Sequence, residues 1–197
     1  MKSLPCKLCY NSKEGCDIMI VLVGASASGK TELAKTLYQT YGYSKCVTTT
    51  TRQPRENEID GKDYHFVTRQ YFQMLIEQDA FYEVTHYNDN IYGIQKKDVN
   101  VNGVVIVDPH GANTLVSKAA EDVFVVYVET NKETREKRMK LRGDSQDAIA
   151  IRLDTDDHIF DKSAFIRIDR WLRNEHHTIA ELAKDVHDSY QQFIRKN

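Results

Sequence analysis

The stretch GASASGKT, from Gly24 to Thr31, constrains the fold of this chain more than any other feature. It follows the apolar run DIMIVLV, leads into the helically spaced segment KTELAKTLYQTY and matches the pattern GxxxxGK[ST] without a gap. In that pattern the glycines let backbone N–H groups turn inward around a phosphate, and the lysine reaches the β- and γ-phosphate oxygens. A helix that starts at the loop adds partial positive charge. The stretch therefore predicts a nucleoside triphosphate site between a buried strand and a helix.

The whole loop is expected to bind ATP: Gly24, Ala25, Ser26, Ala27, Ser28, Gly29, Lys30 and Thr31. The Thr31 hydroxyl is placed to hold Mg²⁺ in such a loop.

Apolar runs rich in β-branched residues recur at 18–23, 103–108 and 123–129, as is typical of buried parallel strands. Segments with helical spacing separate and follow these runs, and the alternation predicts an α/β fold with a parallel sheet flanked by helices. Residues of about 45–95 break the alternation, because this stretch is rich in strand patterns with polar and aromatic residues. We interpret it as a small inserted lobe.

Near the carboxyl end, the sequence AFIRI at 164–168 predicts a further strand. A long amphipathic helix is expected from about Glu175 to the end of the chain.

Composition limits the classes of partner. The 197 residues fit one domain, with room for a small inserted one, and the net charge of −2 gives no general attraction to nucleic acid or to a membrane surface. No apolar run reaches the length that spans a bilayer, and the first residues, MKSLPCKLCYNSKEGC, lack the apolar core of a secretory signal. A cytoplasmic protein is expected, and its oligomeric state is left open.

Cys6, Cys9 and Cys16 lie ahead of the first predicted strand. CKLC is a CxxC pair, but a structural zinc site normally needs four ligands and no second pair follows. We expect residues 1–18 to be a reduced amino-terminal tail rather than a metal site.

A second informative stretch is TTTTRQPRENEIDGKDYHF, at 48–66. Arg52 and Arg55 are separated by a turn that Pro54 stiffens, and such a pair of arginines can grip a phosphate bidentately. The Tyr64 hydroxyl and a threonine can add donors. An isolated RxxR is usually a solvated loop, but next to a triphosphate site it suggests a second nucleotide.

The order of TTTTRQPR, ENEIDGKDYHFV and FYEVTHYNDNIYG resembles the successive signatures of guanylate kinases, over roughly residues 19–155. The resemblance implies that Thr48, in place of the family's serine, binds the GMP phosphate with Arg52, Arg55 and Tyr64. It also implies that Glu83 reads the guanine and that Tyr92 closes the site. Asp108 is the retained carboxylate of a family segment and is expected near the GMP and the metal.

The chemistry of guanine supports the role of Glu83 independently. Guanine presents N1–H and N2–H₂ side by side, and a carboxylate offers two acceptors to them. Adenine has an acceptor at N1, which would face a lone pair of the same carboxylate. The alternative is that Glu83 is a strand residue that faces water, as charged strand residues usually do.

The chain departs from the resemblance at several positions. Ile94 stands where the family has a hydroxyl that meets guanine, so base selection is expected to be looser, with only apolar contact from Ile94. Ile106 and His110 replace polar residues around Asp108. The family's Asn-Asp segment on the adenine side is not recognisable in IRIDRWLRNEHH, at 166–177.

The reaction between two anions requires positioning and charge neutralisation more than a strong base. The candidate catalytic residues are Lys30, Arg52, Arg142 and Arg152, the last two by resemblance to mobile lid arginines. Arg138 is a further cation for ATP, and Thr31 and Asp108 are the candidate metal ligands. Arg138, Arg142 and Arg152 could instead belong to a solvent-exposed helix face without a role in binding. Asp108 could instead only cap the end of its strand.

These features together predict a P-loop NTPase-type α/β fold with three parts: a core of 19–44 and 96–197, a lobe for the nucleoside monophosphate at about 45–95, and a helical lid at about 138–155. The predicted reaction is phosphoryl transfer from ATP, with Mg²⁺, to GMP, and the expected partners are these small molecules. A kinase of another phosphorylated acceptor and a non-catalytic guanylate kinase-like binding module are the alternatives.

Overall fold

The computed structural model describes residues 19–87, 89–99 and 102–196. The amino-terminal stretch with Cys6, Cys9 and Cys16 lies outside these residues, so the prediction of a reduced tail stays a prediction.

The core is a parallel sheet whose strand order is β2-β7-β1-β8-β9. Its strands are β1 (Met19–Val23), β2 (Ser44–Lys45), β7 (Gly103–Ile106), β8 (Val123–Glu129) and β9 (Arg170–Arg173). The first strand pairs with β7 on one side and β8 on the other, which puts the end of β1 and the loop that follows it at the middle of the sheet. The predicted α/β fold class is confirmed.

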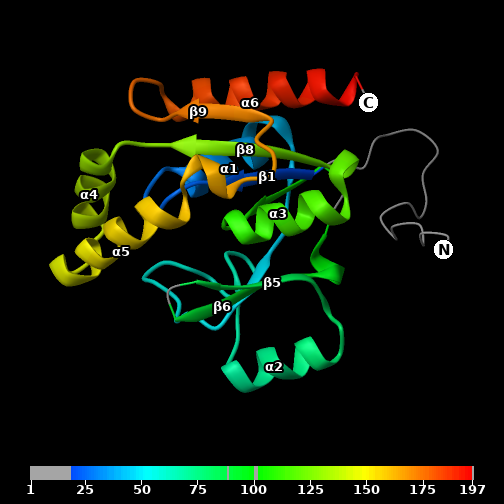
Figure 1. The fold of residues 1–197 in the computed structure, drawn as a ribbon, viewed down its shortest axis with the longest axis vertical. Helices are drawn as coiled ribbons and strands as arrows, with labels where there is room; N and C mark the ends of the chain where they lie inside the picture. Colours follow the sequence, from blue (N-terminus) through cyan, green and yellow to red (C-terminus); the bar gives the residue numbers. More distant parts are fainter. Residues whose placement is uncertain (1–18, 88, 100–101, 197) are drawn as a thin grey trace.

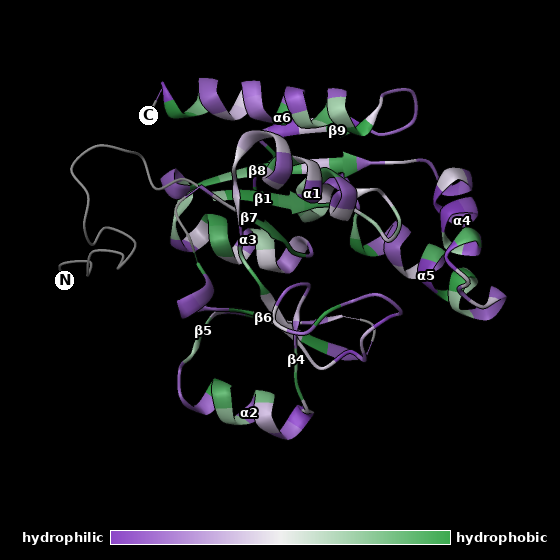
Figure 2. Cartoon of the chain, turned by 180° about the vertical axis from the view of Figure 1, so that it is seen from behind, coloured by the Kyte–Doolittle hydropathy of each residue, from purple (hydrophilic) through white to green (hydrophobic). Residues whose placement is uncertain are grey.

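Helices cover both faces of this sheet, as Figure 1 shows. Alternate residues of β1 face opposite sides: Ile20 and Leu22 pack with α1 (Lys30–Tyr41) and α6 (Ile179–Ile194), and Val21 packs with α3 (Pro109–Lys118). Because both faces are covered, the central strands are apolar throughout, and Figure 2 shows β1 and β8 as hydrophobic.

A second sheet has the order β4-β3-β6-β5 and lies on the α3 side of the core (Figure 1). Its elements are β3 (Thr48–Thr50), β4 (His65–Phe66), α2 (Arg69–Glu77), β5 (Phe81–Tyr87) and β6 (Asn90–Gln95). Phe72 and Leu75 of α2 pack against Phe81 and Ile91 to form a small separate apolar cluster. Polar residues of this sheet, among them Thr48 and Glu83, line a cavity together with Gly24 after β1 and Asp108 after β7.

The helices α4 (Lys132–Leu141) and α5 (Gln146–Ile159) project beyond the carboxyl end of β8 (Figure 1). Met139, Ile149 and Leu153 form their contact, and Ala27 of the glycine-rich loop packs against it. The two helices therefore rest on the loop.

The carboxyl-terminal region differs from the sequence-based expectation. The strand expected at 164–168 lies instead at Arg170–Arg173, because the Asp169 backbone and side chain bond Val125 and fix where pairing with β8 begins. The last helix starts at Ile179 rather than Glu175, because Thr178 and Glu181 form a capping box. Short 3₁₀ turns also occur at η1 (Lys96–Asp98), η2 (Ala120–Asp122) and η3 (Lys162–Ala164).

Of the helices in the described ranges, none combines the length and the apolar character that crossing a membrane requires.

Candidate active site

The glycine-rich loop needs both of its glycines for steric reasons. Gly24 has φ +148° and Gly29 has φ +102°, in a region that other residues rarely adopt. A Cβ on Gly24 would lie 2.4 Å from the Val128 carbonyl oxygen, and one on Gly29 would lie 2.2 Å from the Asn174 amide nitrogen. The loop is thus held tightly against β8 and the chain after β9.

The Lys30 ammonium folds back over the loop. Its Nζ donates to the carbonyl oxygens of Gly24 and Ala25, both at 2.7 Å, and lies 3.3 Å from the Ser28 hydroxyl. Burial lowers the pKa of Lys30 to about 8, and the Asp156 carboxylate opposes this shift. A phosphate in the loop would supply a negative charge next to this half-buried cation and favour its charged form.

Asn174 joins the loop to the end of β9, and the sequence did not reveal it. It is buried, and its Nδ2 donates to the Ser28 carbonyl at 2.8 Å. Arg138 donates to the carbonyl oxygens of Ala27, at 3.2 Å, and Asn174, at 3.5 Å. The stretch in which no adenine-side segment was recognisable therefore does contribute a loop-binding asparagine, and its place directly after a strand is the signal that was available.

Asp156 is a second functional candidate that sequence reasoning missed. Its fully buried carboxylate accepts the Ser26 backbone N–H at 2.6 Å and the Tyr87 hydroxyl, and lies 3.7 Å from the Arg135 guanidinium. The buried residues Ile149 and Leu153 stand seven and three positions before it, so the helical spacing did place Asp156 on the inward face of α5.

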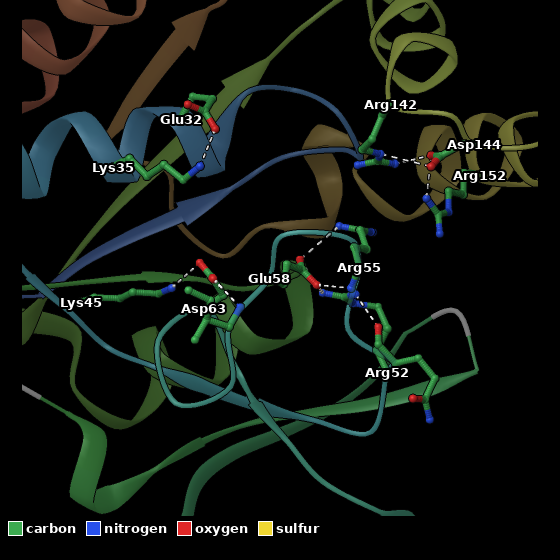
Figure 3. A network of polar contacts seen from close by, with 12 residues as sticks. Glu32, Lys35, Lys45, Arg52, Arg55, Glu58, Asp63, Arg142, Asp144 and Arg152 are labelled. Atoms are coloured by element: carbon green, nitrogen blue, oxygen red, sulfur yellow. Dashed lines mark hydrogen bonds and ion pairs between the residues drawn. The ribbon is translucent and has the colours of Figure 1, made fainter.

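Arg52 and Arg55, the pair predicted to bind a phosphate and called the arginine fork below, both contact the carboxylate of Glu58. The Arg52 Nη2 donates to both oxygens of Glu58 at 2.9 Å, and the Arg55 backbone N–H donates to Glu58 Oε2 at 2.7 Å (Figure 3). Arg52 also lies over the Tyr64 ring, 5.1 Å from its centre. Glu58 neutralises part of the charge and fixes the direction of Arg52, while the Arg55 guanidinium remains exposed.

Two adjoining cavities are lined by residues of the glycine-rich loop, of the second sheet and of helix α4 with the residues that follow it. One has about 710 Å³ and the other about 170 Å³. Most of the predicted site residues line the smaller cavity: Gly24, Ser26, Ala27, Lys30, Thr31, Thr48, Arg52, Arg55, Tyr64, Glu83, Tyr92, Asp108 and Arg142. Ser28, Gly29 and Arg138 line the larger one. Among the described residues that were predicted, Ala25 and Arg152 line neither.

Glu83 lies at the base of the smaller cavity with an unused hydrogen-bond acceptor. Its side chain is 5% exposed, and its Oε1 has no hydrogen-bond partner among the described residues. Burial raises the pKa of Glu83 to about 7. A Cβ at Gly111 would lie 3.0 Å from Oε1, so a glycine at that point of α3 makes room for the carboxylate. A buried acceptor of this kind is satisfied by a ligand that brings N–H donors.

Asp108 caps helix α3 and also lines the smaller cavity. Its Oδ1 caps α3 by accepting the Gly111 backbone N–H at 2.8 Å, and it accepts the Thr85 hydroxyl at 3.3 Å. The same hydroxyl lies 3.1 Å from Nδ1 of His110. Burial raises the pKa of Asp108.

Ile94 lies between two predicted site residues but is packed into the core. It is fully buried, packs with Val21 and Val105 in the core beneath α3, and lines neither cavity. It pairs with Thr48 on one side and Glu83 on the other, and its side chain fills the contact between the two sheets. The expected apolar contact between Ile94 and a base stays a prediction, because Ile94 lines neither cavity but lies between two residues that line the smaller one. Ile106, by contrast, lines both cavities.

The two predicted lid arginines share one carboxylate. Arg142 and Arg152 both donate to Asp144, Arg142 through Nε at 3.2 Å and through Nη2, and Arg152 through Nη1 at 3.0 Å (Figure 3). Arg142 lines both cavities, whereas Arg152 is held behind Asp144. The arrangement gathers positive charge next to the arginine fork.

Comparison with known proteins agrees with this geometry. The family model described as guanylate kinase matches residues 17–167. A guanylate kinase of Nitrosospira multiformis is 36% identical over 143 residues, which cover 68% of each chain. One of Onion yellows phytoplasma is 31% identical over 191 residues, 90% of each chain. The crystal structure of guanylate kinase from Anaplasma phagocytophilum superposes with a TM-score of 0.67 at 23% identity, covering 90% of this chain and 86% of that one.

Proposed function

The chain belongs to the guanylate kinase family, and we propose on this basis that it transfers the γ-phosphoryl group of ATP to GMP. A phosphate oxygen of GMP forms the new bond to the γ-phosphorus, and the bond from that phosphorus to the β–γ bridging oxygen breaks. GDP and ADP are the products. The observation that carries the proposal is the buried Glu83 Oε1, which has no partner among the described residues and faces the cavity that the arginine fork also lines.

On the acceptor side, Arg52 and Arg55 bind the GMP phosphate, with the hydroxyls of Thr48 and Tyr64 as further donors. These four residues line one cavity with Glu83, which supports a single ligand that has a phosphate at one end and N–H donors at the other. Glu58 holds Arg52 in place for this ligand. Tyr92 lines the same cavity and closes it over the base.

On the donor side, the loop from Gly24 to Thr31 holds the ATP phosphates, and Arg138 lies beside it for the same ligand. Lys30 leaves the loop carbonyls and pairs with the β- and γ-phosphates. Arg142 comes from the lid and neutralises charge on the transferred group, and Arg152 acts with it through their shared Asp144. The second pKa of a phosphate monoester is near 6, so GMP is already nucleophilic at neutral pH and no strong base is needed.

Magnesium is part of the proposal, and the side chains fit it. The exposed Thr31 hydroxyl lies at the first turn of α1 in the cavity, and Asp108 lies at the end of β7. Among the described residues there is no cluster of three acidic, histidine or cysteine side chains that could hold a metal alone. This suits Mg²⁺, which takes most of its ligands from phosphates and water and neutralises charge on the triphosphate when bound.

The proposal assigns three working parts: a core of 19–44 and 96–197, an acceptor lobe at about 45–95 and a lid at about 138–155. It includes small-molecule substrates only, without nucleic acid or membrane, and a cytoplasmic location. The net charge of −2 gives no general attraction to nucleic acid or to a membrane surface.

The test is a coupled ADP-release assay with GMP, dGMP, IMP and AMP. GMP should give the highest kcat/KM, and Lys30→Ala should abolish turnover. If the protein phosphorylates another acceptor but not GMP, the proposal that GMP is the acceptor is wrong and the compound that reacts takes its place. No turnover from a folded sample would favour a non-catalytic binding module.

A further inference from the structure

Tyr87, the last residue of β5, lines the acceptor cavity but turns its hydroxyl toward the glycine-rich loop. Its side chain lines the smaller cavity together with Glu83 and Tyr92, and its ring lies edge-on to that of Tyr92 with the centroids 6.4 Å apart. Its hydroxyl lies 3.3 Å from the Ser26 hydroxyl and donates to Oδ1 of Asp156. One side chain therefore connects the cavity proposed for GMP with the loop proposed for ATP.

Asp156 places a buried negative charge next to this loop. Its side chain is fully buried, and its Oδ2 accepts the Ser26 backbone N–H at 2.6 Å and lies 3.7 Å from the Arg135 guanidinium. Burial lowers the pKa of Lys30, and the Asp156 carboxylate is the strongest influence that raises it. Asp156 is thus an internal counter-ion of the loop and of its lysine.

A triphosphate in the loop brings charge of the same sign as this carboxylate. Water cannot screen the repulsion at a fully buried group, so the carboxylate depends on its hydrogen-bond donors and on its ion pair to stay ionised. Burial and the Asp156 charge both raise the pKa of Tyr87, so its hydroxyl keeps the proton that it donates. The hydrogen bond from Tyr87 should therefore contribute more when phosphates occupy the loop than when they do not.

We propose that the Tyr87 hydroxyl supports the binding of ATP, although the side chain lines the cavity for GMP. It acts through Asp156, and Asp156 acts through the Ser26 backbone, so Tyr87 is a positioning residue of the glycine-rich loop and not a contact of the triphosphate. The inference rests on one part of the proposed function, which is the binding of the ATP phosphates by the loop from Gly24 to Thr31.

The experiment measures two affinities by titration calorimetry: that of GMP, and that of the β,γ-imido analogue of ATP with Mg²⁺, which is not cleaved. Tyr87→Phe removes the hydroxyl and keeps the ring that packs against Tyr92 and Phe160. The dissociation constant of the analogue should rise about fivefold to tenfold, at the lower end of the coupling that is usual between two sites. The dissociation constant of GMP should not change. In turnover, the KM for ATP should rise while the KM for GMP stays constant.

Tyr82→Phe is the matched control, because Tyr82 is a half-buried tyrosine of the same strand that lines neither cavity. It should leave both affinities unchanged. A second comparison tests the path through the carboxylate. Asp156→Asn keeps the size of the side chain and removes its charge, so adding Tyr87→Phe to Asp156→Asn should weaken the binding of the analogue little further. For a variant of low stability, the shift of the unfolding midpoint with saturating analogue gives the affinity instead.

An unchanged affinity of Tyr87→Phe for the analogue would overturn the inference. An equal loss of affinity for the analogue and for GMP would overturn it as well, because the hydroxyl would then only support the fold. So would a full effect of Tyr87→Phe in the Asp156→Asn background, because the carboxylate would not carry it. A wild type that binds the analogue but transfers no phosphoryl group to GMP would contradict the proposed function instead, so the two failures are distinguishable.

Discussion

The Asp156 carboxylate accepts the backbone N–H of Ser26 at 2.6 Å, although 130 positions separate the two residues in the chain. Asp156 lies on helix α5 and Ser26 in the glycine-rich loop, and the Tyr87 hydroxyl from β5 reaches the same carboxylate. One buried carboxylate thus contacts the loop after β1, the second sheet and α5. A displacement of α5 or of that sheet relative to the loop would change these hydrogen bonds.

Removing this carboxylate should destabilise the protein strongly. Asp156→Ala leaves the Ser26 N–H without its acceptor and removes one of the two carboxylates next to the buried Arg135 guanidinium. Breaking a buried ion pair from one side typically costs about 3–5 kcal/mol. The free energy of unfolding in urea measures this. Asp154→Ala is the control, because its side chain is exposed on the same helix α5 and a surface substitution usually changes stability by no more than about 0.5 kcal/mol. Equal effects of the two substitutions would contradict the role of Asp156.

The affinity for GMP should depend on the protonation of Glu83. Burial raises the pKa of Glu83 to about 7, so below this pH the carboxyl is mostly protonated and presents a donor to the N–H groups of guanine. GMP affinity should therefore rise as the pH increases through about 7 and become constant above it.

Titration calorimetry from pH 5.5 to 8.5 measures this dependence. The phosphate of GMP also ionises, near pH 6. In Glu83→Gln the affinity for GMP should still change with pH near 6, because the GMP phosphate still ionises, but the change near pH 7 should be lost. Identical pH profiles for the two proteins would show that Glu83 does not meet the base.

Arg52→Ala should weaken the binding of GMP without changing the binding of ATP. Its guanidinium lines the smaller cavity but not the larger one, and loss of a charged hydrogen bond commonly costs about 1.5–3 kcal/mol. The KM for GMP should rise by one to two orders of magnitude at that cost, while ATP binding stays constant. Arg69→Ala, which removes an exposed arginine of the same lobe bonded to the Asp89 carbonyl, should leave both unchanged. Weakened ATP binding in Arg52→Ala would show that the fork does not serve the acceptor.

Ile94→Ser should destabilise the protein without improving the use of GMP. The substitution removes a fully buried apolar side chain and places a hydroxyl in the core, which costs about 2–5 kcal/mol. Thermal unfolding and GMP kinetics on the same sample measure both effects. A tighter GMP interaction in this variant would mean that position 94 does face the base after all.

The sequence predicts the parts of this site that depend on local order. The loop from Gly24 to Thr31 is recognisable because the buried strand, the loop and the helix follow one another directly in the sequence. Arg52 and Arg55 are recognisable for the same reason. The strand and helix alternation also gives the fold class, since parallel strands require covering helices.

The contacts across the fold could not be predicted in this way. Asp156 and Asn174 reach the loop from positions 130 and 146 residues away, and only the packing of α5 and β9 brings them there. The orientation of Ile94 depends on how β6 pairs with β3 and β5, including a register shift between Phe81 and Glu83. Ile94 pairs directly with Thr48 and Glu83, which line the smaller cavity, and directly paired residues share one face of a sheet. The packing of Ile94 against Val21 and Val105 depends on contact between the two sheets, which motif position alone does not show.

The most direct test of the central claim follows the transferred group itself. The purified chain is incubated with GMP, Mg²⁺ and ATP that carries ³²P in the γ-position, and the products are separated. The proposed function predicts that the label appears in the β-position of GDP, that Lys30→Ala and Arg52→Ala reduce it strongly, and that AMP in place of GMP accepts little. Label that appears only in inorganic phosphate, or that stays in ATP with a folded sample, would contradict a kinase that acts on GMP.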